Sequence, residues 1–196
     1  MGIWDRAIAG VCAGAGIAAG AAMLLLGTGP VAAQGMPHEG AHEHAAAPVD
    51  CALARIAPPP ELAGWNGRAP APAARDAKGL KTAVLTVGRA VDARLARTAD
   101  VRYVLRPEKP GGSVSYGGLF AFDVKEAGIY RVALGSGAWI DLLRDGKAIQ
   151  STNHGHGPDC TGIRKMVDFP LAPGRHVLQL AANGAETLPV MIARLP

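Results

Sequence analysis

The sequence predicts an all-β protein, an antiparallel β-sandwich preceded by an extended Ala/Pro-rich N-terminal segment. From about residue 81 onward, apolar residues recur at every second position, which is the period of a strand and not of a helix. Turn-forming pairs divide this pattern into short segments: Asp-Gly at 145–146, Pro-Gly at 173–174 and Asn-Gly at 183–184. No stretch suits a helix longer than a turn or two. About nine short strands at this spacing are typical of a sandwich.

The expected strands follow from which residues share a face. The alternating apolar sets are Ala83, Leu85 and Val87; Val91, Ala93 and Leu95; Val101, Tyr103 and Leu105; Phe120, Phe122 and Val124; Tyr130, Val132 and Leu134; Val167, Phe169 and Leu171; His176, Leu178 and Leu180; and Leu188, Val190 and Ile192. Residues 139–144 and 147–151 add a hairpin, because the Asp-Gly pair between them is the strongest short hairpin signal. One face of each strand should therefore point into a common core.

The first 33 residues predict an export signal. Arg6 supplies a short charged region, residues 8–26 are an apolar run rich in alanine and glycine, and the Val-Ala-Ala sequence at 31–33 fits a cleavage site. The mature chain would begin at Gln34, in the periplasm or outside the cell. An uncleaved membrane anchor is the alternative that the length of the apolar run leaves open. We expect contact with a membrane only through this segment, and only where it stays uncleaved.

Residues 34–75 have the composition of a tether, and residues 76–196 are expected to form the sandwich domain. Alanine, proline and glycine dominate the tether, which therefore buries too little apolar surface to fold alone. Near its end, residues 61–65 could form a short helical turn that places Leu62 and Trp65 against the core. The tether is thus expected to be loose at its start and docked near its end.

Two cysteines remain once the signal and its Cys12 are removed. In an oxidising compartment the even number favours a disulfide between Cys51 and Cys160. A sulfur held in a disulfide is no longer a thiolate ligand for a metal.

The charge pattern predicts no nucleic-acid partner. The formal net charge is +4, and the basic residues are spread singly among strands and turns, without a cluster interleaved with aromatic residues. We find no nucleophile elbow, no phosphate-binding loop and no opposed pair of carboxylates, so the known hydrolase types are disfavoured. An unidentified small ligand or a partner protein remains the expected partner.

Residues 153–160, Asn-His-Gly-His-Gly-Pro-Asp-Cys, form the clearest candidate site. Imidazoles, a carboxylate and a thiol occur together only here. Residues two apart on a strand face the same side, so His154 and His156 can converge, with Asp159 close by. Such a set suits zinc or copper. The competing interpretation is structural: a turn-rich loop closed by Asp159 and fixed by a disulfide at Cys160.

A second group of histidines lies in the loose part of the tether. His38, His42 and His44, near Met36, could bind copper or zinc weakly, as short His-rich tracts do. The alternative is a polar, solvated tail.

Several segments resemble the jelly-roll sandwiches of bacterial pre-peptidase C-terminal and carbohydrate-binding modules. The matching pieces are Phe-Ala-Phe-Asp-Val at 120–124, Ala-Gly-Ile-Tyr-Arg-Val at 127–132, the Asp-Gly pair at 145–146 and Leu-Ala-Pro-Gly-Arg-His-Val-Leu at 171–178. The resemblance covers roughly residues 117–195. It implies a jelly-roll-like fold and a binding module, and it assigns no functional residue.

A fainter resemblance is to cupins, including ring-cleaving enzymes such as homogentisate dioxygenase. Those proteins bind iron through a His-x-His, a carboxylate and a distant histidine, and here His154, His156, Asp159 and His176 would supply these parts. The resemblance implies a small metal-dependent oxidoreductase with Fe(II). His176 also shares a face with Leu178 and Leu180, which favours a partly buried structural histidine.

Three functions therefore remain open from the sequence. The leading hypothesis is an exported β-sandwich binding or accessory protein, with a transition metal at His154, His156 and Asp159 as its candidate ligand. The second is the cupin-type oxidoreductase. The third is a structural protein whose loop is pinned by the disulfide.

Overall fold

The computed structural model describes residues 50–51 and 56–196. The predicted export signal and, within the predicted tether, residues 34–49 and 52–55 lie outside these residues. Within them, no helix has the length and apolar character needed to cross a membrane.

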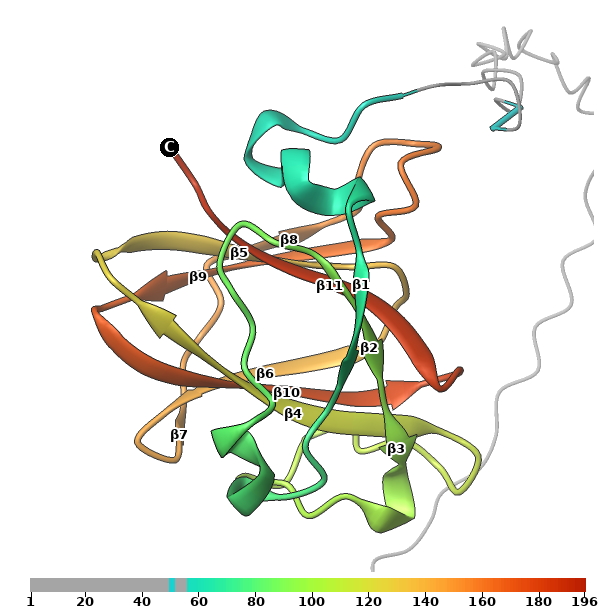
Figure 1. Ribbon diagram of the computed structural model, residues 1–196, viewed down its shortest axis with the longest axis vertical. Coiled ribbons are helices and arrows are strands. Elements are labelled where there is room, and N and C mark those ends of the chain that lie inside the picture. Colours follow the sequence, from blue (N-terminus) through green and yellow to red (C-terminus); the bar gives the residue numbers. More distant parts are fainter. Residues whose placement is uncertain (1–49, 52–55) are drawn as a thin grey trace, which may run out of the picture. The chain divides into compact units, whose positions relative to one another are not determined.

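The described chain forms two β-sheets packed face to face, which confirms the predicted all-β sandwich (Figure 1). Sheet A has the strand order β1 (Ala69–Pro72), β2 (Val91–Arg94), β11 (Thr187–Arg194), β5 (Gly128–Leu134), β9 (Lys165–Leu171) and β8 (Asn153–Gly155). Sheet B has the order β3 (Ala96–Arg97), β4 (Tyr116–Val124), β10 (Gly174–Asn183), β6 (Trp139–Arg144) and β7 (Lys147–Ala148). Three short 3₁₀ helices are η1 (Pro60–Asn66), η2 (Ala77–Lys81) and η3 (Thr98–Asp100).

Consecutive strands cross between the sheets, as they do in jelly rolls. The chain passes from β4 in sheet B to β5 in sheet A and back to β6, and it crosses twice more between β9, β10 and β11. All the strand pairs of the two sheets are antiparallel except β1 with β2. The β6–β7 hairpin turns at Asp145 and Gly146, which both have positive φ, as the favoured two-residue hairpin turn requires.

The main core fills the space between the sheets with the alternating residues that the sequence predicted. Phe120 and Phe122 from β4 meet Leu178 and Leu180 from β10 on one side, and residues of β5, β9 and β11 on the other. A smaller core lies on the outer face of sheet A, where Leu62 and Trp65 of η1 pack with Ala133, Met191 and Ile163. Figure 1 shows η1 on the side of this sheet that faces away from sheet B.

The sandwich begins earlier than the boundary predicted at residue 76. Strand β1 pairs in parallel with β2, residue 69 opposite Val91, and η1 precedes it. Proline is tolerated in β1 because it is an edge strand, where a missing N–H costs no ladder hydrogen bond on the open side. The prediction that Leu62 and Trp65 dock in a short helical turn is confirmed, since both side chains are fully buried.

Two of the predicted strands are not strands in the structure. Residues 83–87 make only an isolated bridge, Val84 with Ala121. Residues 101–105 run as an irregular segment over the outer face of sheet B. The side chain of Gln179 takes the place of a neighbouring strand there: its Oε1 accepts from Val104 N at 2.8 Å and Leu105 N at 3.1 Å, and its Nε2 donates to Leu105 O at 2.9 Å.

Candidate functional site

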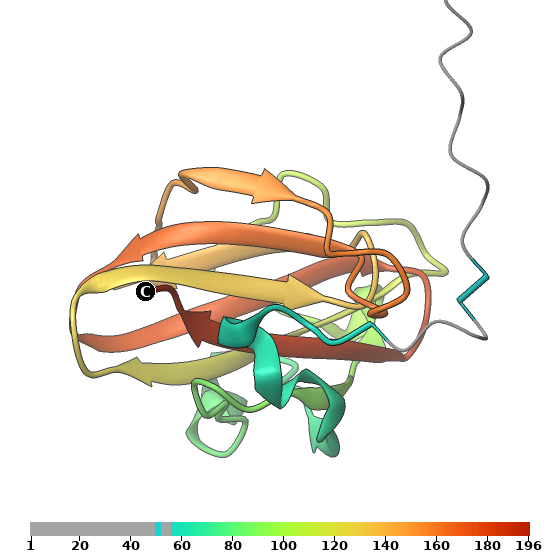
Figure 2. The same cartoon turned by 90° about the horizontal axis from the view of Figure 1, so that it is seen from above.

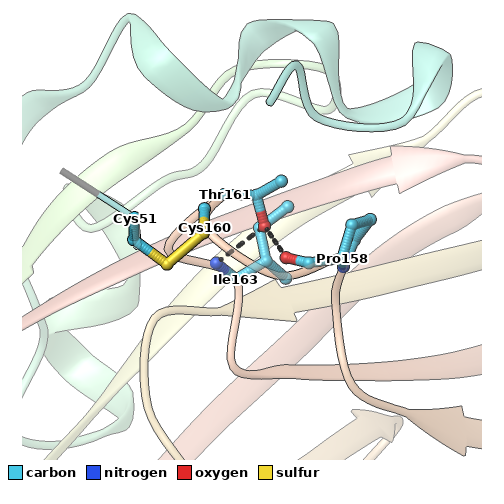
Figure 3. The surroundings of a disulfide bond; sticks show 5 residues. All are labelled: Cys51, Pro158, Cys160, Thr161 and Ile163. Carbon is cyan, nitrogen blue, oxygen red and sulfur yellow. Dashed lines mark hydrogen bonds between the residues drawn. A yellow bond between two sulfur atoms is a disulfide. The ribbon is translucent and has the colours of Figure 1, made fainter. Parts of the chain in front are cut away.

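The predicted disulfide between Cys51 and Cys160 is present and anchors the candidate loop. It joins cysteines 109 residues apart and ties the N-terminal segment to the loop that follows β8 (Figure 3). A disulfide is consistent with an extracellular location. Cys160 is therefore a structural anchor and not a metal ligand.

Hydrogen bonds hold the same loop in one conformation. The Thr161 hydroxyl donates to Pro158 O at 2.6 Å and accepts from Ile163 N at 3.3 Å, so that it closes a tight turn (Figure 3). The Trp65 indole Nε1 donates to Thr161 O at 3.0 Å from the outer core. Since Thr161, Ile163 and Trp65 are buried, this end of the loop belongs to the packed body of the domain. The structural interpretation of the loop accounts for these contacts.

The two histidines of the loop are both exposed. His154 lies on the edge strand β8, and its backbone N–H donates to the Asn153 side chain at 2.9 Å. The His156 ring places Nδ1 at 2.9 Å from Arg164 O, which orients the ring and leaves Nε2 without a partner among the described residues. Asp159 is exposed on the turn beyond them.

His176 does not join this loop. It lies on β10 of sheet B with 1% of its surface exposed, where its ring stacks on Phe122 at a centroid distance of 5.5 Å. Its Nδ1 lies 3.0 Å from Gly174 O, and its Nε2 is buried without a partner. The alternation of β10 turns His176 into the main core together with Leu178 and Leu180, so it is more deeply buried than the sequence suggested.

No three-ligand metal group occurs among residues 50–51 and 56–196. In that part of the chain, no three His, Cys, Asp or Glu side chains lie close enough together to hold a metal ion. The predicted set of His154, His156 and Asp159, with or without His176, is therefore not assembled. His38, His42 and His44 lie outside the described residues.

The loop borders a hollow in the surface of the domain, which we call the loop hollow. This loop hollow has a volume of about 770 Å³ and is lined by His156, Pro158, Asp159, Ile163 and Arg164 beside the disulfide. The side chains of Asp159 and Arg164 have no hydrogen bond or ion pair within the described chain. One carboxylate, one guanidinium and one imidazole nitrogen are thus available to a ligand.

Arg164 lines the loop hollow, and the sequence analysis did not single it out. Its backbone N–H donates to Leu134 O at 2.8 Å, which holds the residue at the end of β5. The only signal in the sequence is its position four residues after Cys160. Its proximity to His156 depends on the chain returning along β9, which spacing alone does not reveal.

Removing the disulfide should destabilise the protein. Because the bond closes a loop of 109 residues, the variant with both Cys51→Ala and Cys160→Ala should lose about 2–4 kcal/mol of unfolding free energy. Denaturant titration measures the loss. Dithiothreitol should lower the stability of the wild type to a similar extent and leave the double variant unchanged. Equal stability of the oxidised wild type and the variant would contradict this expectation.

His176 should make stability depend on pH. Burial, followed by the charge of Arg144, lowers the pKa of its imidazole below the ordinary 6.5, although the bond to Gly174 acts in the opposite direction. The unfolded chain therefore takes up a proton near pH 6.5, whereas the folded chain resists protonation until a lower pH. The contribution of neutral His176 to the free energy of unfolding is therefore complete above pH 6.5, and it is lost as the pH falls below that value.

Denaturant titrations at about pH 7.5 and about pH 5 test this expectation. His176→Leu, which keeps an apolar side chain in line with Leu178, should lose less stability on acidification than the wild type. The control His154→Gln changes an exposed histidine and should keep the wild-type pH dependence. The same acid-induced loss in His176→Leu and in the wild type would refute the role of His176.

Comparison with protein-family models found no matching family, and comparison with curated proteins found no significant match.

Proposed function

We propose that this chain is an exported β-sandwich binding protein that holds a small zwitterionic molecule in the loop hollow. The observation that carries the proposal is the pair of unneutralised, opposite charges, Asp159 and Arg164, on a loop fixed by a disulfide. Small-molecule sites usually have volumes of about 300–1,000 Å³ and a few convergent polar groups on a preformed frame, a description that this hollow fits.

The chemistry of the lining selects the class of ligand. A guanidinium binds a carboxylate through two parallel hydrogen bonds, so Arg164 is suited to the anionic end of a ligand. The Asp159 carboxylate suits an ammonium group. His156, oriented by its bond to Arg164 O, can exchange a hydrogen bond through Nε2, and Ile163 and Pro158 contact the apolar part. We therefore expect a zwitterion the size of an amino acid or dipeptide.

Export is supported by the sequence of residues 1–33 and by the disulfide. The cupin-type oxidoreductase would need His176 beside the loop histidines. Since His176 faces the core from sheet B and the loop follows β8 of sheet A, binding is the function that the geometry favours.

An NMR titration with the dipeptide alanyl-alanine tests the proposal. Amide resonances of residues 156–164 should shift with a saturable concentration dependence. The N-acetylated dipeptide lacks the ammonium and the dipeptide amide lacks the carboxylate, so both should bind more weakly. Arg164→Gln should weaken binding roughly tenfold, because it removes a charge-assisted hydrogen bond.

Arg94→Gln provides the matched control, since Arg94 is an exposed arginine on β2 outside the hollow. It should bind like the wild type. The proposal fails if the shifts of residues 156–164 do not saturate, or if Arg164→Gln and Arg94→Gln respond alike.

A further inference from the structure

A second hollow lies at the other end of strand β5. The loop hollow adjoins Arg164, which is bonded to Leu134 at the end of β5, whereas the second hollow adjoins Tyr130 near its start. Figure 2 shows the corresponding segments, the loop after β8 and the β4–β5 connection, at opposite ends of the sandwich. The second hollow has a volume of about 600 Å³, and we call it the β4–β5 hollow.

Apolar side chains form one part of its lining. Leu85, Val87 and Tyr130 belong to the main core or pack against it, and they present their outer edges here. Val84 is 45% exposed because it alternates with the buried Ala83 and Leu85 and so points away from the core. The backbone of Val84 is held by its bridge to Ala121. This apolar surface is therefore fixed in place and open to solvent.

Thr86 and four charged side chains form the rest of the lining, and among the charged ones a single side chain lacks a partner within the described residues. Asp123 pairs with Arg175 at 3.3 Å, and Glu126 pairs with Arg194 at 3.5 Å. Lys125, which lies between the two acids in sequence, forms no hydrogen bond or ion pair with any described residue. Because the two acids are offset by arginines, the charge left for a ligand is the Lys125 ammonium.

We infer that the β4–β5 hollow is a second ligand site, which takes a small amphipathic anion: a carboxylate or sulfonate on an aromatic or aliphatic body. The apolar body would cover the exposed Val84 and the edges of Leu85 and Val87, and removing this apolar surface from water lowers the free energy of the complex. The anionic group would pair with Lys125. This inference is independent of the proposed function, because none of its residues lines the loop hollow.

A fluorescence titration with 8-anilinonaphthalene-1-sulfonate tests the inference on the full chain. This probe combines an aromatic body with a sulfonate, and it brightens when it leaves water. We expect saturable binding with one probe per chain. Lys125→Glu should weaken binding by about fivefold or more, since it turns an attraction near the surface into a repulsion. Val84→Asp should abolish binding by placing a carboxylate on the apolar wall.

Matched controls separate this site from other exposed apolar or basic positions. Val114 is 78% exposed and lies outside the hollow, so Val114→Asp should bind like the wild type. Lys147 is an exposed lysine on β7, and Lys147→Glu should also leave binding unchanged. The neutral probe N-phenyl-1-naphthylamine should bind more weakly than the sulfonate and should not respond to Lys125→Glu. Circular dichroism confirms that each variant is folded.

Three results would each overturn the inference. The first is no saturable fluorescence increase in the wild type. The second is a loss of binding in Val114→Asp that equals or exceeds the loss in Val84→Asp. The third is equal affinity for the neutral and the sulfonated probe, which would remove the role of Lys125.

Discussion

Replacing Arg131 with alanine is expected to lower the free energy of unfolding by about 3–5 kcal/mol. The Arg131 guanidinium donates to both carboxylate oxygens of Asp168, at 2.8 and 2.9 Å, and to Glu61 at 2.6 Å. Asp168 is only 4% exposed, and its other side-chain contact is a long one of 3.4 Å from Asn153. The variant therefore leaves a buried carboxylate without a counterion, and it also removes the ion pair between Glu61 of η1 and sheet A.

A second Arg–Asp pair in the same fold provides the control. Arg131 lies opposite Asp168 in the β5–β9 ladder, and Arg175 lies opposite Asp123 in the β10–β4 ladder. Both pairs join residues directly opposite each other in an antiparallel ladder, but the second makes a single contact of 3.3 Å and is solvent-exposed. Arg175→Ala should therefore cost less than about 1 kcal/mol. Denaturant titration measures the unfolding free energy of both variants. Equal losses in Arg131→Ala and Arg175→Ala would contradict the stabilising role of the buried pair.

Removing both partners of the buried pair should cost less than removing one. In the double variant Arg131→Met with Asp168→Leu, the most deeply buried carboxylate is removed together with its counterion, and apolar side chains fill the site. Only Glu61, whose side chain is 15% exposed, then loses its ion pair. The unfolding free energy of the double variant should lie above that of Arg131→Ala.

Replacing Trp65 with alanine should also destabilise the protein by about 3–5 kcal/mol. The indole is 1% exposed and, with Leu62, forms the centre of the outer core on sheet A. The variant loses this packing and the hydrogen bond to Thr161 O, which holds the candidate loop. Denaturant titration measures the first effect. Faster amide hydrogen exchange in residues 157–163 would report the second.

Trp65→Phe separates the two contributions. Phenylalanine keeps most of the apolar volume but cannot donate to Thr161 O, so the loss should fall to about 1–2 kcal/mol. Trp139→Ala is a further comparison, because Trp139 is partly exposed on β6 and packs in neither core. A loss in Trp65→Ala no greater than that in Trp139→Ala would show that η1 is not docked as described.

Part of the candidate site could be predicted from the sequence. The two cysteines left after the predicted export signal indicate one pairing, and the glycines and proline of residues 153–160 indicate a loop. Which histidines meet could not be predicted, because that depends on which strands become neighbours. His154 and His176 are placed in different sheets by contacts between distant segments, and Arg164 enters the loop hollow only because β9 pairs with β8.

The sequence by itself determined the all-β class, most of the strands and the buried face of each, because a period of two places alternate side chains on opposite faces of a strand. Only the tertiary structure decided that residues 101–105 form an irregular segment, although their apolar alternation predicts a strand. Their backbone is bonded by the side chain of Gln179, which is 74 residues away from Leu105 in the chain. A backbone N–H must find an acceptor when it is buried, but local sequence does not specify which acceptor the fold will bring to it.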